Sequence, residues 1–258
     1  MDPVSAWRAS ENIPAFGSRN ILTWDGSAGA GFPTVAQTLA LTAPVAAYLA
    51  GERTGEGTIY RTRANLLGDI VHSSPVYVKD SDTVYVGAND GMLHAFNAST
   101  GREQFAYVPG GINLAALKTL SNPAYAHRYF VDGELVVSTK QQTPDKNILV
   151  GLLGAGGKSV YALDVTSPVT MTPSKVLWEF SDPDLGNALG KPVVVELNNG
   201  KTGVMFGNGY NSALEHSVLF ILDIQTGALI KKLDTQKGSA ELSNGMAAAN
   251  GWDLDEDV

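Results

Sequence analysis

The stretch TVYVGANDGMLHAFNASTGREQFAYV, residues 83–108, decides the fold because its pattern occurs three times along the chain. A short apolar run ends in glycine, a polar turn follows, and a second apolar run ends in Asn or Asp before a third run returns. The other two copies are NILVGLLGAGGKSVYALDVTSP (147–168) and TGVMFGNGYNSALEHSVLFILDIQTGALIKKL (202–233). A unit that recurs with the same internal order indicates a repeat architecture.

Each unit is preceded by one more apolar segment, at 73–79, 128–138 and 190–197. This predicts four strands per unit, joined by hairpin turns. The apolar runs are nearly continuous, which is typical of strands that are buried on both faces. Sheets stacked face to face around an axis meet that condition, so we expect an all-β, partial β-propeller. A β-sandwich of short strands is the alternative, and the constant order within the unit disfavours it.

The repeat also predicts how the chain is divided. Residues 1–60 form an N-terminal lead-in with a helix near 36–50, and residues 61–258 form about three four-stranded blades and the start of a fourth. The expected blades cover about 73–109, 128–180 and 190–234, and the next begins within 244–258. Between the first two blades, residues 110–127 form an insertion with a helical turn or two that Pro123 ends. The Asn or Asp that closes the third strand, followed by Thr-Gly in two units, caps a turn and has no chemical role.

Charge and composition exclude several classes of partner. Eighteen Lys and Arg residues against 26 Asp and Glu give a net charge of −8, which argues against a nucleic-acid partner. Cysteine is absent, so there are no disulfides or thiolate metal sites. The first ten residues, MDPVSAWRAS, lack the pattern of a signal peptide, and residues 33–51 make a poor membrane span. Because the repeat breaks off within a unit, we expect any targeting sequence to lie outside this stretch.

Two strings carry a resemblance to a known family, LLGDIVHSSPVYV (66–78) and GAGGKSVYALDVT (154–166). They resemble the C-terminal propeller of the PilY family, which comprises tip-associated biogenesis proteins and adhesins of bacterial type IV pili. The resemblance runs from about Arg61 to the end and, more loosely, includes 18–26 and 45–52. The string VGANDGMLHAFNASTG (86–101) is less specific, because quinoprotein-type propellers share it.

The resemblance implies a quinoprotein-like propeller that controls pilus extension and retraction and helps to attach cells to surfaces. It implies pilus components such as minor pilins, and host or abiotic surfaces, as partners. It also implies an exported protein at the bacterial cell surface, the pilus tip or the outer membrane. The family controls its pili in part through a calcium loop of the pattern Asp-x-Asp-x-Asp-x-x-x-Asp.

The final residues, GWDLDEDV (251–258), place Asp253, Asp255 and Asp257 on alternate positions. Calcium takes six to eight oxygen ligands, and carboxylates at alternate loop positions can converge on one ion. By resemblance, these three aspartates map onto the family's calcium loop, whose fourth acid would fall beyond Val258. Glu256 stands where a turn-forming glycine is common in the family. The alternative is a solvated acidic tail, because short acidic motifs often occur without a metal.

No other motif predicts a catalytic or cofactor-binding residue. The four histidines, His72, His94, His127 and His216, show no metal-binding spacing, and structural imidazoles are expected at His72 and His94. The stretches GLLGAGG (151–157) and SDPDLG (181–186) are predicted to be turns. The resemblance therefore implies a non-enzymatic pilus regulator and adhesin. The alternatives are a pyrroloquinoline-quinone-dependent dehydrogenase propeller and a non-catalytic outer-membrane interaction scaffold.

Overall fold

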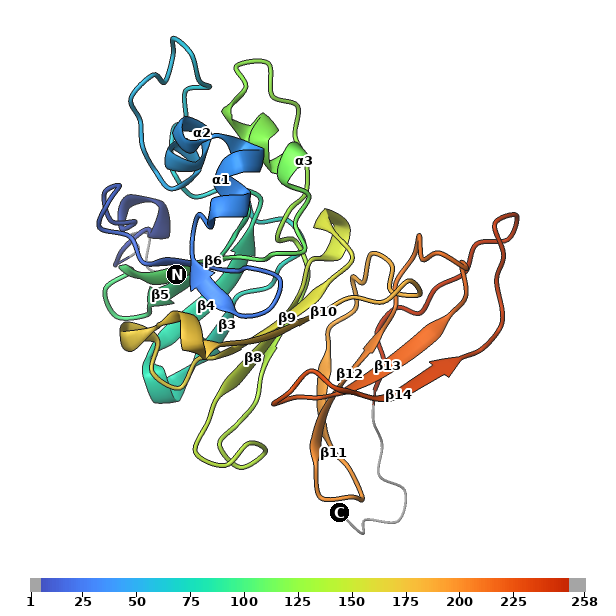
Figure 1. Ribbon diagram of the computed structural model, residues 1–258. Helices are drawn as coiled ribbons and strands as arrows, with labels where there is room; N and C mark the ends of the chain where they lie inside the picture. The colour runs from blue at the N-terminus through green and yellow to red at the C-terminus, as the bar shows by residue number, and fades with distance from the viewer. Residues whose placement is uncertain (1–5, 251–258) are drawn as a thin grey trace.

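The computed structural model describes residues 6–250, and its strands form three sheets that stand side by side (Figure 1). Blade 1 consists of β3 (Val76–Val78), β4 (Thr83–Ala88), β5 (Met92–Asn97) and β6 (Glu103–Val108). Blade 2 consists of β7 (Leu135–Val137), β8 (Ile148–Leu152), β9 (Val160–Asp164) and β10 (Val176–Phe180). Blade 3 consists of β11 (Val193–Glu196), β12 (Thr202–Gly207), β13 (Val218–Asp223) and β14 (Leu229–Asp234). Neighbouring strands in each blade are antiparallel, which confirms the predicted all-β, propeller-like fold.

The hairpins between the third and fourth strands are closed by the predicted turn residues. In blade 1, Asn97 Oδ1 accepts the Thr100 N–H at 2.9 Å, and Gly101 has a φ of 73°. In blade 3, Asp223 Oδ1 accepts the Thr226 N–H at 3.1 Å, and Gly227 has a φ of 70°. A φ in this range favours glycine, because a Cβ atom would clash with the backbone. The repeated Thr-Gly pair is therefore a structural device.

The blades stack through two apolar cores. One core joins blade 1 to blade 2, where the rings of Tyr107 and Tyr161 lie 5.3 Å apart. The other joins blade 2 to blade 3, where the Trp178 indole N–H donates to the carbonyl of Ile224 at 3.0 Å. All five residues of β9 are buried, since its sheet is covered on both faces. Burial on both faces of the sheet explains why the apolar runs in the sequence are continuous.

The N-terminal residues add two strands to blade 1, which the sequence did not predict. β1 (Ile21–Trp24) lies parallel to β6, with Ile21 opposite Ala106, and β2 (Gly29–Gly31) pairs with β1. The segment is therefore part of the first sheet as well as a lead-in. Strands of three or four residues without alternation carry little sequence signal, and a parallel pairing across about 80 residues carries none. The division of the chain into a lead-in and a propeller stays a prediction.

The helix expected near 36–50 is two helices, α1 (Val35–Leu41) and α2 (Ala43–Leu49). The break falls at Thr42, whose φ is 75°, and Pro44 follows in the first turn of α2, where proline is tolerated. The insertion after blade 1 contains α3 (Leu114–Lys118), and the three helices gather at one end of blade 1 (Figure 1). No helix within residues 6–250 is long and apolar enough to cross a bilayer. The 3₁₀ turns are Ala9–Glu11, Lys79–Ser81, Thr119–Ser121, Gly154–Gly156, Pro168–Thr170 and Pro173–Lys175.

The two outer faces of the stack differ. The face of blade 1 that points away from blade 2 is covered by the N-terminal segment, where the Trp7 indole N–H donates to Ala98 O at 2.8 Å. In blade 3, burial alternates along β13: Phe220 and Leu222 are buried, whereas Ile221 is half-buried. Because paired residues of antiparallel strands share a face, Val193 lies with Ile221 on the open side.

Candidate functional site

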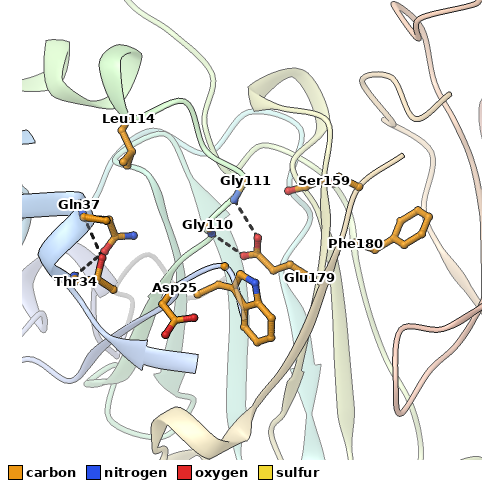
Figure 2. Close-up of a pocket in the computed structure, with 13 residues that line it drawn as sticks. Asp25, Thr34, Gln37, Gly110, Gly111, Leu114, Ser159, Glu179 and Phe180 are labelled. Carbon is orange, nitrogen blue, oxygen red and sulfur yellow. Dashed lines mark hydrogen bonds between the residues drawn. The ribbon is translucent and has the colours of Figure 1, made fainter. Parts of the chain in front are cut away.

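A cavity of about 420 Å³ lies where the N-terminal residues, the insertion and blade 2 meet (Figure 2). Its walls come from the turn between β1 and β2, from the start of α1, from the Gly110–Gly111 loop and from β10. These segments are distant in the sequence, and the stacking of blade 1 on blade 2 brings them together. Pockets of this size are typical of small-molecule sites.

Glu179, on β10, lines this cavity beside the Gly110–Gly111 loop (Figure 2). Its Oε1 accepts the Tyr107 hydroxyl and the Gly110 N–H, both at 2.6 Å, and its Oε2 accepts the Gly111 N–H at 3.0 Å. Burial raises the pKa of Glu179, although these three donors favour its charged form. The carboxylate thus joins blade 2 to the end of blade 1 and fixes the loop that begins the insertion.

Asp25 lies at the mouth of the cavity, in the turn between β1 and β2. Its Oδ1 accepts the backbone N–H groups of Ala28 and Ser27, each at 2.8 Å, and the Ser27 hydroxyl at 2.9 Å. These hydrogen bonds hold the pKa of Asp25 below its usual value. The side chain is therefore charged at neutral pH and held in one orientation, while Oδ2 bonds to no described residue.

Ser159 forms part of the cavity wall at the start of β9 and is only 6% exposed. Its hydroxyl has no hydrogen-bond partner among residues 6–250. A buried hydroxyl without a partner costs free energy, so such groups often have a ligand or an ordered water as partner. In Figure 2 the Ser159 side chain points toward Gly111, on the side of the cavity where Glu179 lies.

A second polar cluster, which is largely buried, lies on the covered face of blade 1. His94 donates from its ring to Glu103 at 2.7 Å and to Asp90 at 3.0 Å, and Arg19 donates to Glu103 at 2.7 Å. Burial alone would lower the pKa of His94, but the carboxylates of Asp90 and Glu103 raise it to about 9. Burial alone would raise the pKa of Glu103, but His94 and Arg19 lower it to about 2. Every charge in the cluster has an internal partner, so its role is structural.

The residues predicted to bind calcium, Asp253, Asp255 and Asp257, lie outside the described residues. Within residues 6–250 there is no group of three or more side chains that could hold a metal ion. The two aspartates of the SDPDLG segment already have a partner within the protein, because the Lys232 ammonium lies 2.7 Å from Asp182 and 2.6 Å from Asp184.

The remaining histidines each have one carboxylate partner. His72 lies 2.6 Å from Asp132, His127 lies 2.8 Å from Asp69, and His216 lies 3.1 Å from Asp234. Both His72 and His94 are therefore paired with acids, in agreement with the structural roles expected for them.

Sequence reasoning missed the cavity residues Asp25, Ser159 and Glu179. One signal was available for Glu179, because a lone acid interrupts the otherwise apolar strand VLWEF (176–180). A charge in a strand that is buried on both faces needs a partner, and such a position is a candidate for a site. Asp25 and Ser159 lie in ordinary turn and strand contexts and give no such signal.

Comparison with known proteins decides the family. The family model described as the PilY1 beta-propeller domain matches residues 68–258. The chain belongs to the PilY1 β-propeller family. The type IV pilus biogenesis factor PilY1 homolog of Xylella fastidiosa strain Temecula1 is 40% identical over 232 residues. The type IV pilus biogenesis factor PilY1 of Pseudomonas aeruginosa strain UCBPP-PA14 is 38% identical over 233 residues.

These PilY1 relatives are much longer than the chain. The alignments cover 74% and 78% of the chain but only 16% and 20% of the two relatives. Among solved structures, the Pseudomonas aeruginosa PilY1 C-terminal domain is 40% identical, with a TM-score of 0.49 over 64% of this chain and 32% of that chain. A quinohemoprotein alcohol dehydrogenase from Pseudomonas putida is 20% identical, with a TM-score of 0.42 over 71% of this chain and 23% of that chain.

Proposed function

We propose that this chain is a propeller segment of a type IV pilus biogenesis factor and acts in pilus extension and retraction and in surface attachment. The observation that carries the proposal is membership of the PilY1 β-propeller family over residues 68–258. It is supported by 40% and 38% identity to two proteins that are named as pilus biogenesis factors. The partners would be pilus components such as minor pilins, and host or abiotic surfaces, at the cell surface or pilus tip.

We infer that the segment is not an enzyme. Among the described residues, His94 is fully buried and bonded to Glu103 and Asp90, and the Glu179 carboxylate is held by the Tyr107 hydroxyl and two backbone N–H groups. A catalytic acid or base needs access to a substrate as well as a shifted pKa. A quinoprotein dehydrogenase is the alternative, and it predicts that the purified protein acquires a quinone absorbance band when pyrroloquinoline quinone and calcium are added. We expect no such band.

Calcium dependence is the finer part of the proposal. Asp253, Asp255 and Asp257 offer carboxylate oxygens on alternate positions, the donor type that calcium prefers. Three side chains supply about half of the six to eight ligands that calcium takes, so the shell requires further oxygen ligands. Bound calcium would neutralise the mutual repulsion of these acids and fix the loop.

The test is made in the bacterium that encodes the protein. Deleting the gene should remove most surface pili and reduce twitching and attachment, and the wild-type gene should restore them. A gene with Asp253→Ala, Asp255→Ala and Asp257→Ala should restore assembly or retraction only in part and should no longer respond to added calcium. The matched control is Asp182→Ala, in an Asp-x-Asp pair that Lys232 already bridges. Unchanged piliation and attachment in the deletion strain would contradict the pilus function.

A further inference from the structure

The cavity around Glu179 has hydrogen-bonding capacity that the protein does not use. We propose that it binds a neutral saccharide unit, with the Trp24 indole against the sugar ring and with Asp25 and Ser159 bonded to its hydroxyl groups. The inference goes beyond the pilus function, since it concerns a small-molecule site on the propeller itself and can be tested on purified protein.

The charge of the cavity excludes anionic ligands. Its walls contain the carboxylates of Asp25 and Glu179 but no Lys, Arg or His side chain. A phosphate, a sulfate or an acidic sugar placed there would meet two acids without a compensating cation. A neutral ligand avoids that repulsion.

The unused groups are both acceptors and donors, as a sugar hydroxyl requires. Asp25 Oδ2 is a free acceptor, and its position is fixed because Oδ1 receives three hydrogen bonds. The Ser159 hydroxyl can both donate and accept and has no partner among the described residues. The Trp24 indole N–H donates to no described residue either. Each sugar hydroxyl can use one donor and one acceptor, whereas a cation such as a guanidinium could use only the acceptors.

The apolar part of the wall suits the carbon face of a sugar ring. Trp24 is half-buried and lines the cavity together with Leu114. An aromatic ring offers a flat, polarisable surface for C–H groups and keeps its polar edge available. Phe180 is not part of this surface, because its ring points away from Glu179 (Figure 2) and packs 5.6 Å from Phe220 in blade 3. A volume of about 420 Å³ accommodates one or two sugar units.

The loop that frames the site is held in place before any ligand binds. Glu179 fixes the N–H groups of Gly110 and Gly111. A cavity that is already ordered spends less free energy on binding. Glu179 is therefore a positioning residue, and Trp24, Asp25 and Ser159 are the contact residues.

The test is a binding titration by ligand-observed NMR with the purified protein. The probes are glucose, galactose, N-acetylglucosamine and cellobiose, with L-arginine as the cationic probe. We expect at least one saccharide to bind with a dissociation constant of about a millimolar, and L-arginine not to bind. Trp24→Ala should abolish the saccharide signal. Asp25→Asn, which keeps the acceptor Oδ1 but replaces Oδ2 with a donor, should weaken binding about fivefold or more, and Ser159→Ala about threefold.

The matched control is Asp223→Asn, since Asp223 caps a similar turn in blade 3 far from the cavity. It should leave saccharide binding unchanged. Thermal midpoints near that of the wild type would show that the Asp25 and Ser159 variants are folded. The proposal is overturned if no saccharide binds, if L-arginine binds instead, or if the folded Asp25→Asn and Ser159→Ala variants both bind as tightly as the wild type. None of these results bears on piliation, which the gene deletion tests separately.

Discussion

At the scale of single residues, the buried charges of blade 1 are the most consequential feature. The side chains of Arg19 and Glu103 are 3% and 1% exposed, and that of His94 is fully buried. Taking such groups out of water is costly, and only their close pairing offsets the cost. Because Arg19 comes from the N-terminal segment and the other two from blade 1, the cluster also fixes that segment to the sheet.

Removing one member of this cluster should therefore destabilise the protein strongly. Glu103→Gln leaves His94 and Arg19 buried without their shared carboxylate, and we expect a loss of about 3–5 kcal/mol in the free energy of unfolding. Chemical denaturation measures it. The control is Glu11→Gln, which breaks an exposed pair with Arg8 at 3.6 Å and should change stability little. Equal effects of the two substitutions would show that the buried cluster does not stabilise the fold.

The same cluster should give stability a defined pH dependence. The pKa of His94 rises from 6.5 to about 9 on folding, so its contribution is complete below about pH 6.5 and is lost as pH rises through 9. The pKa of Glu103 falls from 4.5 to about 2, so its contribution is complete above about pH 4.5 and is lost as pH falls toward 2. The stability that His94 and Glu103 contribute should therefore be greatest between about pH 4.5 and about pH 6.5.

Denaturation midpoints at about pH 6 and about pH 9 test the alkaline limb. The wild type should lose stability between the two values, and His94→Gln should lose less. An equal loss of stability in the wild type and in His94→Gln would show that a group other than His94 titrates.

At the scale of elements, the stack depends on a repeated contact between a tryptophan and a turn. Trp178 covers Gly227 and donates to Ile224 O, while Trp7 covers Gly101 and donates to Ala98 O. In both cases the accepting carbonyl belongs to the residue after the turn's Asn or Asp. The N-terminal segment thus makes the same contact on blade 1 that blade 2 makes on blade 3.

A comparison of two glycines distinguishes the free-energy cost of disturbing the tryptophan contact from the cost of backbone strain alone. Gly227 has a φ of 70° and Gly200 a φ of 73°, but a Cβ at Gly227 would lie 2.6 Å from Trp178, whereas at Gly200 nothing lies within 4 Å. Gly200→Ala should cost about 1 kcal/mol from the backbone alone, and Gly227→Ala about 1–3 kcal/mol more. Thermal or chemical denaturation compares them. Equal losses of stability would mean that the Trp178 side chain can move aside at no cost and does not fix the turn.

The elements also show what a sequence can reveal. The antiparallel hairpins were predictable, because their strands are adjacent in the chain and their turns carry Asn or Asp with Thr-Gly. The pairing of β1 with β6, the break at Thr42 and the cavity around Glu179 were not, since each depends on contacts between distant segments or on one backbone angle. Asp253, Asp255 and Asp257 lie outside the described residues, so their calcium role stays a prediction.

At the scale of the whole molecule, the described residues cover one end of the stack and leave the other open. On the open face of blade 3, Leu233 pairs with Leu219, and the Leu233 side chain is 45% exposed. Blades of a propeller bury such faces against one another. An uncovered repeat face favours association.

The isolated 258-residue chain should therefore bind a hydrophobic dye or self-associate. Replacing Leu233 with Gln should lower dye fluorescence and association without a large loss of stability, since this side chain is already exposed. Leu242→Gln, at a 79% exposed position outside the strands, is the control and should change little. A monomeric wild-type chain that binds no dye would contradict this account.

We propose that calcium bound by Asp253, Asp255 and Asp257 controls this PilY1-family segment, and titration calorimetry with calcium measures that binding. The chain ending at Val258 should bind calcium at about millimolar concentration at best, and the chain extended by one blade should bind far more tightly. Asp253→Ala or Asp257→Ala should abolish the tight binding, whereas Asp182→Ala, in the pair bridged by Lys232, should preserve it. Tight binding that survives Asp253→Ala and Asp257→Ala, or no binding by the extended chain, would contradict the account.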